Sequence, residues 1–474
     1  MERGIPVLND KIFREYDVRG IAGSDIDRDV AFFLGRAFAV FLKRRNPDAR
    51  KTSVGRDVRM SSEWLTEGVI DGIRAEGIDV VDIGVCPTPL QYFSIVHLGL
   101  DGGIMVTGSR NLPEYNGFKI SVGRETIHGI DMQTLKEIIE KGDWGKADIV
   151  GGISRFDIGE VYRQYMISEF SYLDAPSFKR LKVIVDAGNG TAGAIAPDIL
   201  SQIGCDVVQL YCEPDGSFPN HPPDLTVVEN IRDLIEETIR SRADIGVGYD
   251  GDSDRIGVVD RCGNIVWGDQ LMIVLGREVL KKHPGARIIG DVKCSQSMFD
   301  DIKANGGIPV MWKTGHSLIK QKMRDEGALI AGEFSGHIFI ADRYFGYDDT
   351  LYTTFRLVEI MKQTGKDILE LLSDIPKLYY TPEIRVDCPD DKKRAAVNKI
   401  VEKFLAYKEN DDSPCRIVDL DTTDGVRVIF EDGCGLVRTS NTQPVVVMRV
   451  EAKNEASLEK YRRFLDEEFR KASM

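Results

Sequence analysis

The sequence contains no long uninterrupted apolar run, and its first residues, Met1–Pro6, have no segment like the apolar core of a signal peptide. Its eight cysteines include no C-x-x-C pair, so neither a disulfide framework nor a zinc site is favoured. These absences predict a cytoplasmic protein with reduced thiols and no membrane partner.

Positively charged residues are outnumbered by negatively charged ones. The chain has 62 lysines and arginines against 76 aspartates and glutamates, which gives a formal net charge of -14. This balance argues against a nucleic-acid partner and against an anionic membrane surface. Any anionic substrate must therefore meet basic side chains that are gathered locally.

What is present is a repeated order of predicted strands and helices. The first segment has strands at 52–54, 79–83 and 103–106 and a helix at 61–75; the second has strands at 181–186, 206–211 and 245–249 and a helix at 191–203; the third has strands at 287–290, 309–312 and 328–330 and a helix at 297–304. At 474 residues the chain exceeds what one hydrophobic core usually supports. We predict an α/β fold with three topologically related mixed α/β domains, residues 1–150, 151–256 and 257–374, and a smaller C-terminal α+β domain, residues 375–474.

A polar loop follows the last strand of each repeat. These loops are residues 107–111, 250–255 and 332–337. Open α/β sheets bind ligands at the carboxyl ends of their strands. The three loops are therefore expected to converge on a central cleft between the domains.

The second of these loops reads Asp250-Gly251-Asp252-Ser253-Asp254-Arg255. Three carboxylates crowded into five residues repel one another unless they share a cation, and oxygen ligands suit Mg²⁺ or Ca²⁺. An EF-hand would need Gly at its sixth position and an acid at its twelfth, where this chain has Arg255 and Arg261. A metal site for phosphate chemistry is the leading interpretation, because metal and guanidinium together neutralise phosphoryl oxygens, and an acidic surface turn is the competing one.

The first loop holds a serine beside cations. Ser109 stands between Gly108 and Arg110, and Lys119 follows ten residues later. A phosphorylated serine could supply a further oxygen to the metal of the aspartate loop. Taken alone, a loop serine is more typical of an ordinary turn.

Two other loops offer candidate binding residues. The run Arg438-Thr439-Ser440-Asn441-Thr442 combines a guanidinium, hydroxyls, an amide and backbone N–H groups that could enclose a phosphate dianion, although a polar turn without ligand fits it equally well. His316 and His337 are two of only six histidines, and both lie in glycine-bearing loops. They are candidates for a functional role.

Five motifs together resemble the α-D-phosphohexomutases, and within that superfamily most closely the bacterial phosphomannomutase/phosphoglucomutase group. The motifs run through nearly the whole chain in the family's order: 13–20 (FREYDVRG), 107–111 (TGSRN), 250–255 (DGDSDR), 332–337 (GEFSGH) and 438–444 (RTSNTQP). The resemblance implies reversible conversion of a hexose 1-phosphate, mannose or glucose, into its 6-phosphate through a phosphoserine and a hexose 1,6-bisphosphate. It also implies one Mg²⁺ per chain and glucose 1,6-bisphosphate as activator.

The resemblance implies roles for individual residues as well. Ser109 would be the phosphoserine, and its phosphate with Asp250, Asp252 and Asp254 would bind Mg²⁺. Proton transfer is assigned to Lys119, Arg19 or His337. Substrate binding is assigned to Tyr16, Arg255, Lys293, Gly315, His316, Glu333, Ser335, His337, Arg438, Ser440, Asn441 and Thr442; among these, Glu333 and Ser335 would read the sugar's 3- and 4-hydroxyls, and the Arg438 loop would hold the phosphate that the substrate already carries.

Four positions depart from the family pattern. Arg110 stands where His is usual, Leu112 where Pro is usual, Ser253 where Gly is common, and Phe334 where Met is usual. These changes bear on sugar preference. A phosphoglucosamine mutase is the nearest alternative enzyme, with Gly108 and Phe334 against it, and a non-catalytic sugar-phosphate-binding paralogue is the alternative outside catalysis. We expect a monomer that acts on small hexose phosphates, and a dimer is left open.

Overall fold

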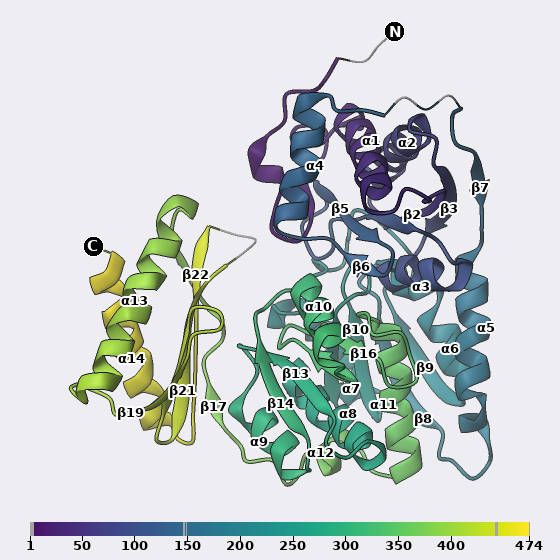
Figure 1. Cartoon of the computed structure of the whole chain (residues 1–474). Coiled ribbons are helices and arrows are strands. Elements are labelled where there is room, and N and C mark those ends of the chain that lie inside the picture. Colours follow the sequence, from purple (N-terminus) through teal and green to yellow (C-terminus); the bar gives the residue numbers. More distant parts are fainter. Residues whose placement is uncertain (1–3, 146, 148, 441–443, 474) are drawn as a thin grey trace.

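The computed structural model describes residues 4–145, 147, 149–440 and 444–473, which form four domains in chain order (Figure 1). Each of the first three is a sheet flanked by helices, and the fourth is a sheet with two helices on one face. The predicted fold, three related α/β domains and a smaller C-terminal domain, is confirmed.

The first domain is built on a seven-stranded sheet in the order β1-β5-β4-β2-β3-β7, with β6 beside β5. Its strands are β1 (Val18–Ile21), β2 (Lys51–Arg56), β3 (Asp79–Val85), β4 (Gly102–Val106), β5 (Tyr115–Val122), β6 (Glu125–Thr126) and β7 (Ile153–Arg155). Its helices are η1 (Asp10–Ile12), α1 (Arg28–Arg45), α2 (Ser62–Ala75), α3 (Thr88–Leu98) and α4 (Ile130–Lys141). Strand β7 pairs in parallel with β3, so this sheet continues past the predicted boundary at residue 150.

The second domain has a five-stranded sheet in the order β12-β11-β10-β8-β9. Its strands are β8 (Leu181–Asp186), β9 (Cys205–Leu210), β10 (Ile245–Tyr249), β11 (Ile256–Asp260) and β12 (Ile265–Val266), and its helices are α5 (Ile158–Phe170), η2 (Ser171–Asp174), η3 (Thr191–Ala194), α6 (Ala196–Gln202), η4 (Val228–Ile231) and α7 (Arg232–Arg240). The helix predicted over 191–203 is two shorter ones, because Ile195 has non-helical backbone angles and Pro197 lies in the first turn of the second, which begins at Ala196. Strands β11 and β12 extend this sheet beyond the predicted boundary at residue 256, since an antiparallel hairpin follows the aspartate loop.

The third domain has a four-stranded sheet in the order β14-β13-β15-β16. Its strands are β13 (Arg287–Asp291), β14 (Ile308–Trp312), β15 (Ile330–Gly332) and β16 (Ile338–Ile340), and its helices are α8 (Gly268–Lys282), α9 (Gln296–Ala304), α10 (His316–Glu326), α11 (Thr350–Thr364) and α12 (Ile368–Leu371). Because β13 pairs in parallel with both β14 and β15, the loops after these strands open at one edge of the sheet.

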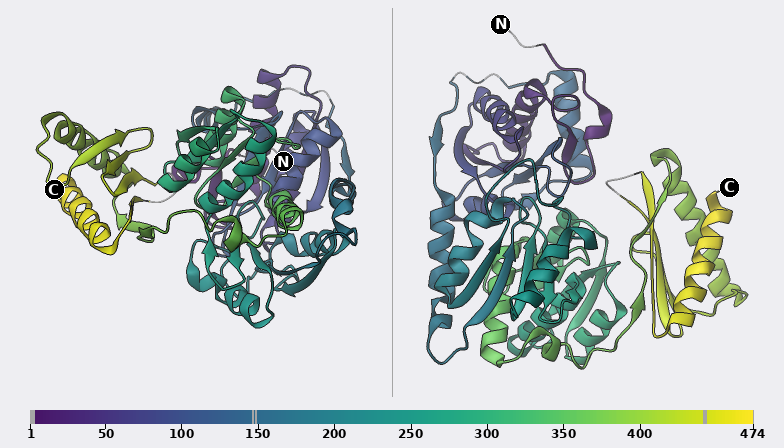
Figure 2. Two further views of the ribbon diagram at one scale, coloured as in Figure 1. Left: turned by 90° about the horizontal axis from the view of Figure 1, so that it is seen from below. Right: turned by 180° about the vertical axis from the view of Figure 1, so that it is seen from behind.

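The fourth domain is an antiparallel sheet in the order β17-β22-β21-β20-β19, with β18 also paired to β22. Its strands are β17 (Tyr379–Tyr380), β18 (Ile384–Asp387), β19 (Ile417–Asp421), β20 (Val426–Phe430), β21 (Gly433–Thr439) and β22 (Val445–Ala452), and its helices are α13 (Asp390–Asn410) and α14 (Glu455–Ser473). The views in Figure 2 show this domain, green to yellow, standing to one side of the other three.

The apolar cores divide the molecule unequally. One buried cluster runs from Val81 to Ile368 and takes side chains from the first, second and third domains. The fourth domain has a cluster of its own, whose buried members all lie between Cys388 and Phe469. No helix in the described part of the chain is long and apolar enough to cross a membrane.

Candidate active site

A cleft of about 610 Å³ lies where the four domains meet. Each domain contributes lining residues, among them Tyr16 and Arg110 from the first, Arg255 from the second, Lys293, Gly315, His316, Glu333, Ser335 and His337 from the third, and Arg438 and Ser440 from the fourth. The volume is typical of a small-molecule site. Five cationic side chains line it, at positions 110, 255, 293, 385 and 438, and supply the local positive charge that an acidic chain needs for an anionic ligand.

The aspartate loop lies buried beside this cleft. Ligand oxygens of Asp250, Asp252 and Asp254 all lie within 4.8 Å of one another. The Ser109 hydroxyl donates a hydrogen bond to Asp250 at 3.1 Å, so the loops after β4 and β10 meet. Lys119 Nζ lies 2.5 Å from Asp252 and also contacts Asp254.

The electrostatics of this loop suit a bound cation. Burial and the neighbouring carboxylates of Asp254 and Asp252 raise the pKa of Asp250 well above its usual value. One oxygen of Asp252 and one of Asp254 are buried without a hydrogen-bond partner among the described residues. Three carboxylates with a serine oxygen beside them form the oxygen-only ligand set of a hard divalent cation. The chain thus has a group of acidic residues able to hold a metal.

Lys119 remains a cation in this setting. Burial lowers the pKa of Lys119, but Asp252 and Asp254 outweigh burial and raise it above its usual value. Burial raises the pKa of the Asp254 carboxyl, yet the charge of Lys119 holds it at about 2. A metal bound to the aspartates would therefore share them with a fixed positive charge.

Asp57 and Arg59, which the sequence did not predict as site residues, hold the backbone of the serine loop. Ser109 has φ 49°, in the left-handed region, and is 2% exposed. Asp57 accepts hydrogen bonds from Thr107 and from the Gly108 N–H, and the buried Arg59 donates to the carbonyls of Ser109 and Asn111, both at 2.7 Å. The polar run 55–59, directly after a predicted strand, was the available signal.

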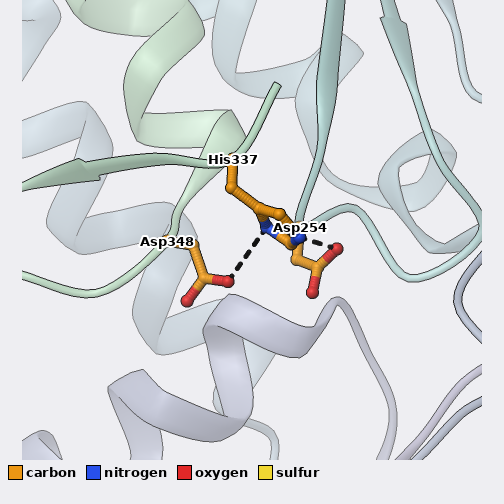
Figure 3. Close-up of side chains that lie close together, drawn as sticks. All are labelled: Asp254, His337 and Asp348. Carbon is orange, nitrogen blue, oxygen red and sulfur yellow. Dashed lines mark ion pairs between the residues drawn. The ribbon is translucent and has the colours of Figure 1, made fainter. Parts of the chain in front are cut away.

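His337 forms part of a buried acidic cluster with Asp254 and Asp348 (Figure 3). Its Nδ1 lies 3.2 Å from Asp348 and 3.8 Å from Asp254. Arg255 Nε donates to His337 Nε2 at 2.9 Å, so we assign the ring proton to Nδ1, on the side of Asp348. Asp348 was not predicted, because nothing in its local sequence sets it apart.

The predicted sugar loop is pre-ordered by its neighbours. Glu333 accepts from the Gly315 N–H at 2.8 Å and from the Ser335 hydroxyl at 3.0 Å. Gly315 has φ 140°, and a Cβ there would lie 2.4 Å from the ring of Tyr16. The Tyr16 hydroxyl donates to the Thr314 carbonyl at 2.7 Å, which ties the first domain to the third. The Glu333 carboxylate and the Ser335 hydroxyl therefore line the cleft in fixed positions.

His316 lies beneath this loop. Its ring centroid is 5.9 Å from that of Tyr16 and 5.7 Å from that of His337. Burial, followed by the charge of Lys320, lowers the pKa of His316 well below its usual value. The side chain is therefore neutral and can only donate or accept hydrogen bonds.

At the far end of the cleft the fourth domain contributes Arg438. Its Nε donates to Asp424 at 2.9 Å, while Nη2 has no hydrogen-bond partner among the described residues. Lys293 Nζ lies 3.2 Å from Glu383, and this contact holds the pKa of Glu383 at about 2. Ser440 lines the cleft, whereas the predicted residues Asn441 and Thr442 lie outside the described part of the chain.

Two arginines of the first domain have separate surroundings. Arg19 donates to Asn111 at 3.0 Å and pairs with Asp17, and it does not line the cleft. Arg110, which occupies the position of the usual family histidine, lies 3.3 Å from Asp224 and from Thr226. It thereby connects the serine loop to the second domain.

Comparison with known proteins agrees with this geometry. Domain models of the phosphoglucomutase/phosphomannomutase family match in order: α/β/α domain I over residues 10–146, domain II over 160–263, domain III over 267–379 and the C-terminal domain over 383–468. A phosphomannomutase/phosphoglucomutase from Pseudomonas aeruginosa is 42% identical over 456 residues, 96% of this chain and 94% of that protein. A phosphoglucomutase from Neisseria gonorrhoeae is 39% identical, with 95% and 94% covered.

A solved structure gives the same result. The crystal structure of a phosphoglucomutase/phosphomannomutase family protein from Burkholderia thailandensis has a TM-score of 0.89, at 37% identity and with 98% of both chains covered. The resemblance inferred from the motifs is therefore confirmed along the whole chain. This chain is a hexose phosphate mutase and belongs to the phosphoglucomutase/phosphomannomutase family.

Proposed function

We propose that the chain interconverts the 1- and 6-phosphates of both mannose and glucose through a phosphorylated Ser109 and a hexose 1,6-bisphosphate. The observation that supports this most directly is the contact of the Ser109 hydroxyl with Asp250, 3.1 Å apart, beside a cleft lined with cations. A serine held against buried carboxylates suits transfer only when a cation offsets their charge.

The cation proposed is a single Mg²⁺, held by Asp250, Asp252, Asp254 and an oxygen on Ser109. The buried carboxylate oxygens without partners fit such an ion. When bound, it would neutralise charge on the serine phosphate and make that phosphate transferable. Lys119 and Arg255 supply further positive charge on either side.

In the transfer itself, the bond between phosphorus and the Ser109 oxygen breaks as a bond from phosphorus to the sugar's free hydroxyl oxygen forms. The hydroxyl proton must leave, and among the proposed groups Lys119, Arg19 and His337 we favour His337. Its Nε2 carries the one lone pair of the ring, which Arg255 Nε would have to release before the proton is taken, whereas Lys119 is held as a cation. Lys119, as a cation, then suits donation of a proton to the serine oxygen as that oxygen leaves in the same step.

Sugar and phosphate are proposed to bind at opposite ends of the cleft. Glu333 and Ser335 would hold the 3- and 4-hydroxyls, which glucose and mannose share, so the configuration at C2 is not read. Lys293, Arg438 and Ser440 would hold the existing phosphate, with Tyr16, Gly315 and His316 completing the wall. The bisphosphate can then turn end for end, and added glucose 1,6-bisphosphate would rephosphorylate Ser109.

The surroundings proposed for this activity are those of a cytoplasmic monomer. Residues from all four domains of one chain line the cleft, so a partner chain is not needed to complete it. All eight cysteines are free thiols. Phosphoglucosamine mutase activity is the second candidate, and Phe334 and Gly108 weigh against it.

The test is a set of mutase assays with Mg²⁺ and a trace of glucose 1,6-bisphosphate on mannose 1-phosphate, glucose 1-phosphate and glucosamine 1-phosphate. Comparable rates on the first two and a much lower rate on the third are expected. Ser109→Ala should lower kcat by roughly 10³-fold or more. The matched control is Ser168→Ala, an exposed serine on α5, which should change nothing. Near-normal turnover by Ser109→Ala would refute the phosphoserine.

A further inference from the structure

A second cavity of about 360 Å³ lies between the first and third domains. Helix α3 and strands β5 and β6 form one side, and α10 with residues 327–329 and 341–347 forms the other. Figure 1 shows α10 directly beneath β6, where these two domains meet. The cavity shares no lining residue with the active-site cleft, and the mechanism above makes no use of it.

Its walls are largely apolar and aromatic. The lining includes Tyr92, Met323, Leu329, Phe345 and Tyr347. The rings of Tyr92 and Tyr347 have centroids 5.4 Å apart, and together with Phe345 they offer flat apolar surface. A ligand with an apolar or aromatic body would remove this surface from water.

One buried polar atom in this wall lacks a partner. Tyr92 is 5% exposed, and its hydroxyl has no hydrogen-bond partner of good geometry among the described residues. A buried hydroxyl without a partner is costly, so such groups usually meet a water or a ligand. This observation, independent of the cavity's shape, points to an occupant with a polar atom.

The charged side chains that line the cavity indicate which charge a ligand would carry. Three cations line the cavity, Arg124, Lys320 and Arg324, and none of the aspartates or glutamates that the structure describes does. Lys320 is 3% exposed, and its Nζ lies 4.1 Å from the centre of the Tyr92 ring. Arg324 pairs with Glu125 at 3.3 Å, whereas Arg124 has no ion pair among the described residues. Lys320 and Arg324 already have acidic partners, Asp348 and Glu125, so the uncompensated positive charge that favours an anion is that of Arg124.

We propose that this cavity is a second binding site, for a small organic anion, a phosphate monoester or carboxylate with an aromatic body. The acidic group would lie among Lys320, Arg124 and the Tyr92 hydroxyl, and the body would pack on Phe345 and Tyr347. Neither half of the ligand suffices: an inorganic ion leaves the apolar wall in water, and a neutral aromatic leaves the cations unmatched.

The site lies one ion pair from the catalytic centre. Lys320 Nζ is 3.1 Å from one oxygen of Asp348, and the other oxygen of Asp348 is 3.2 Å from His337 Nδ1. An anion that pairs with Lys320 competes with Asp348 for it. Occupancy is therefore expected to change the mutase rate as well as to be measurable directly.

The binding test uses the full-length protein with Mg²⁺ and titrates 1-naphthyl phosphate, followed by calorimetry. One molecule per chain should bind, with inorganic phosphate and 2-naphthol each at least about tenfold weaker. Binding should persist in saturating glucose 6-phosphate, because the cleft is a separate site. Loss of binding under that competition, or no binding at millimolar probe, would overturn the proposal.

Two variants locate the site. Ala341→Phe fills the cavity and should abolish binding, and Arg124→Ser removes an exposed cation and should weaken binding about tenfold, or about 1.4 kcal/mol. The control is Arg155→Ser, an exposed arginine on β7 of the same domain. If Ala341→Phe fails to fold, Arg124→Ser alone decides. Unchanged affinity in Arg124→Ser would place the probe elsewhere and contradict the proposal, whatever the outcome of the mutase assays.

Discussion

The first three domains and the fourth are joined by different forces. One apolar cluster passes through all of the first three, from Val81 to Ile368, beside a cluster that belongs to the first domain alone, from Ile12 to Ile139. The fourth domain keeps its apolar residues to itself and meets the third through polar contacts. Buried Arg427 donates to the carbonyls of Val292 at 2.9 Å and Cys294 at 2.7 Å, and Glu451 accepts from the Gln296 N–H at 2.8 Å.

This difference separates two tasks. Serine, aspartates and His337 lie in the three-domain body, where a shared core fixes their distances. Arg438 and Ser440 come from the fourth domain, whose polar contacts can be made and broken at less cost than an apolar core. The residues proposed for phosphoryl transfer thus lie in the first three domains, which share a core. Those proposed to bind the existing phosphate include residues of the fourth domain, which is easier to displace.

The strongest test of the comparison removes a large core side chain from each part. Phe355→Ala in the body should cost about 3–5 kcal/mol and lower the unfolding transition of all three domains together. Phe464→Ala, in the core of the fourth domain, should lower only that domain's transition. Calorimetry with domain-specific proteolysis distinguishes them; a single transition shifted equally by both variants would contradict two separate cores.

A pH experiment sharpens the account of the body. Asp349 is 1% exposed and accepts from the hydroxyls of Tyr162 in the second domain and Tyr344 in the third. Burial raises the pKa of Asp349 to about 6. Its contribution to stability is then fully present below the unfolded pKa of about 3.9 and is lost as pH rises through about 6, a change of about 3 kcal/mol.

Asp349→Asn removes this titration. Urea unfolding of the body between pH 4 and 7 should show the wild type losing stability relative to the variant over that window, with no further relative loss above it. Parallel curves for the two proteins would show that Asp349 does not keep a raised pKa.

At the polar junction, Arg427→Met should loosen the fourth domain. Two buried carbonyls lose their donor, which should cost about 1–2 kcal/mol and raise KM for the hexose phosphate roughly tenfold, with the body's unfolding transition unchanged. Arg416→Met is the matched control, since Arg416 is an exposed partner of Glu431. A fall in kcat with constant KM would instead assign Arg427 to the chemistry.

The smallest effect is expected at the contact between Trp267 and Tyr380 of β17. Trp267 Nε1 donates to the Tyr380 hydroxyl at 3.2 Å, and Trp267 stacks on Phe334 of the sugar loop with centroids 5.1 Å apart. Tyr380→Phe removes only the hydrogen bond and should cost less than about 1 kcal/mol. Small-angle scattering should show that the substrate-free variant is slightly more expanded than the wild type. An unchanged radius of gyration would mean that this contact does not restrain the fourth domain.

The sequence indicated what is local and missed what is distant. The loop of Asp250, Asp252 and Asp254 was readable because three carboxylates stand within five residues after an apolar strand. Arg59, which holds the serine loop, acts on carbonyls 50 and 52 residues away, and the polar run 55–59 does not show which loop it contacts. Asp348 and Lys320 are likewise paired only in space.

The sheet of the second domain extends past the predicted boundary for a related reason. The prediction ended the second domain at residue 256, because the aspartate loop looked like the end of a repeat. The chain instead returns along β11, pairing Ile256 with Tyr249 and Asp260 with Ile245. An antiparallel return after a functional loop has the same apolar texture as the start of a new domain, and only the register distinguishes them.

The left-handed backbone of Ser109 has a consequence for how this protein can evolve. Ser253, in the aspartate loop, shares it, with φ 60° against 49° at Ser109. Non-glycine residues there cost about 1 kcal/mol, and glycine at either position would relieve that strain. At 253 that exchange leaves the ligands intact but gives up the buried hydrogen bond between the Ser253 and Thr191 hydroxyls, 2.9 Å long. At 109 the same exchange would yield a sturdier but inert protein, so selection for activity has to hold this position against a standing pull toward stability.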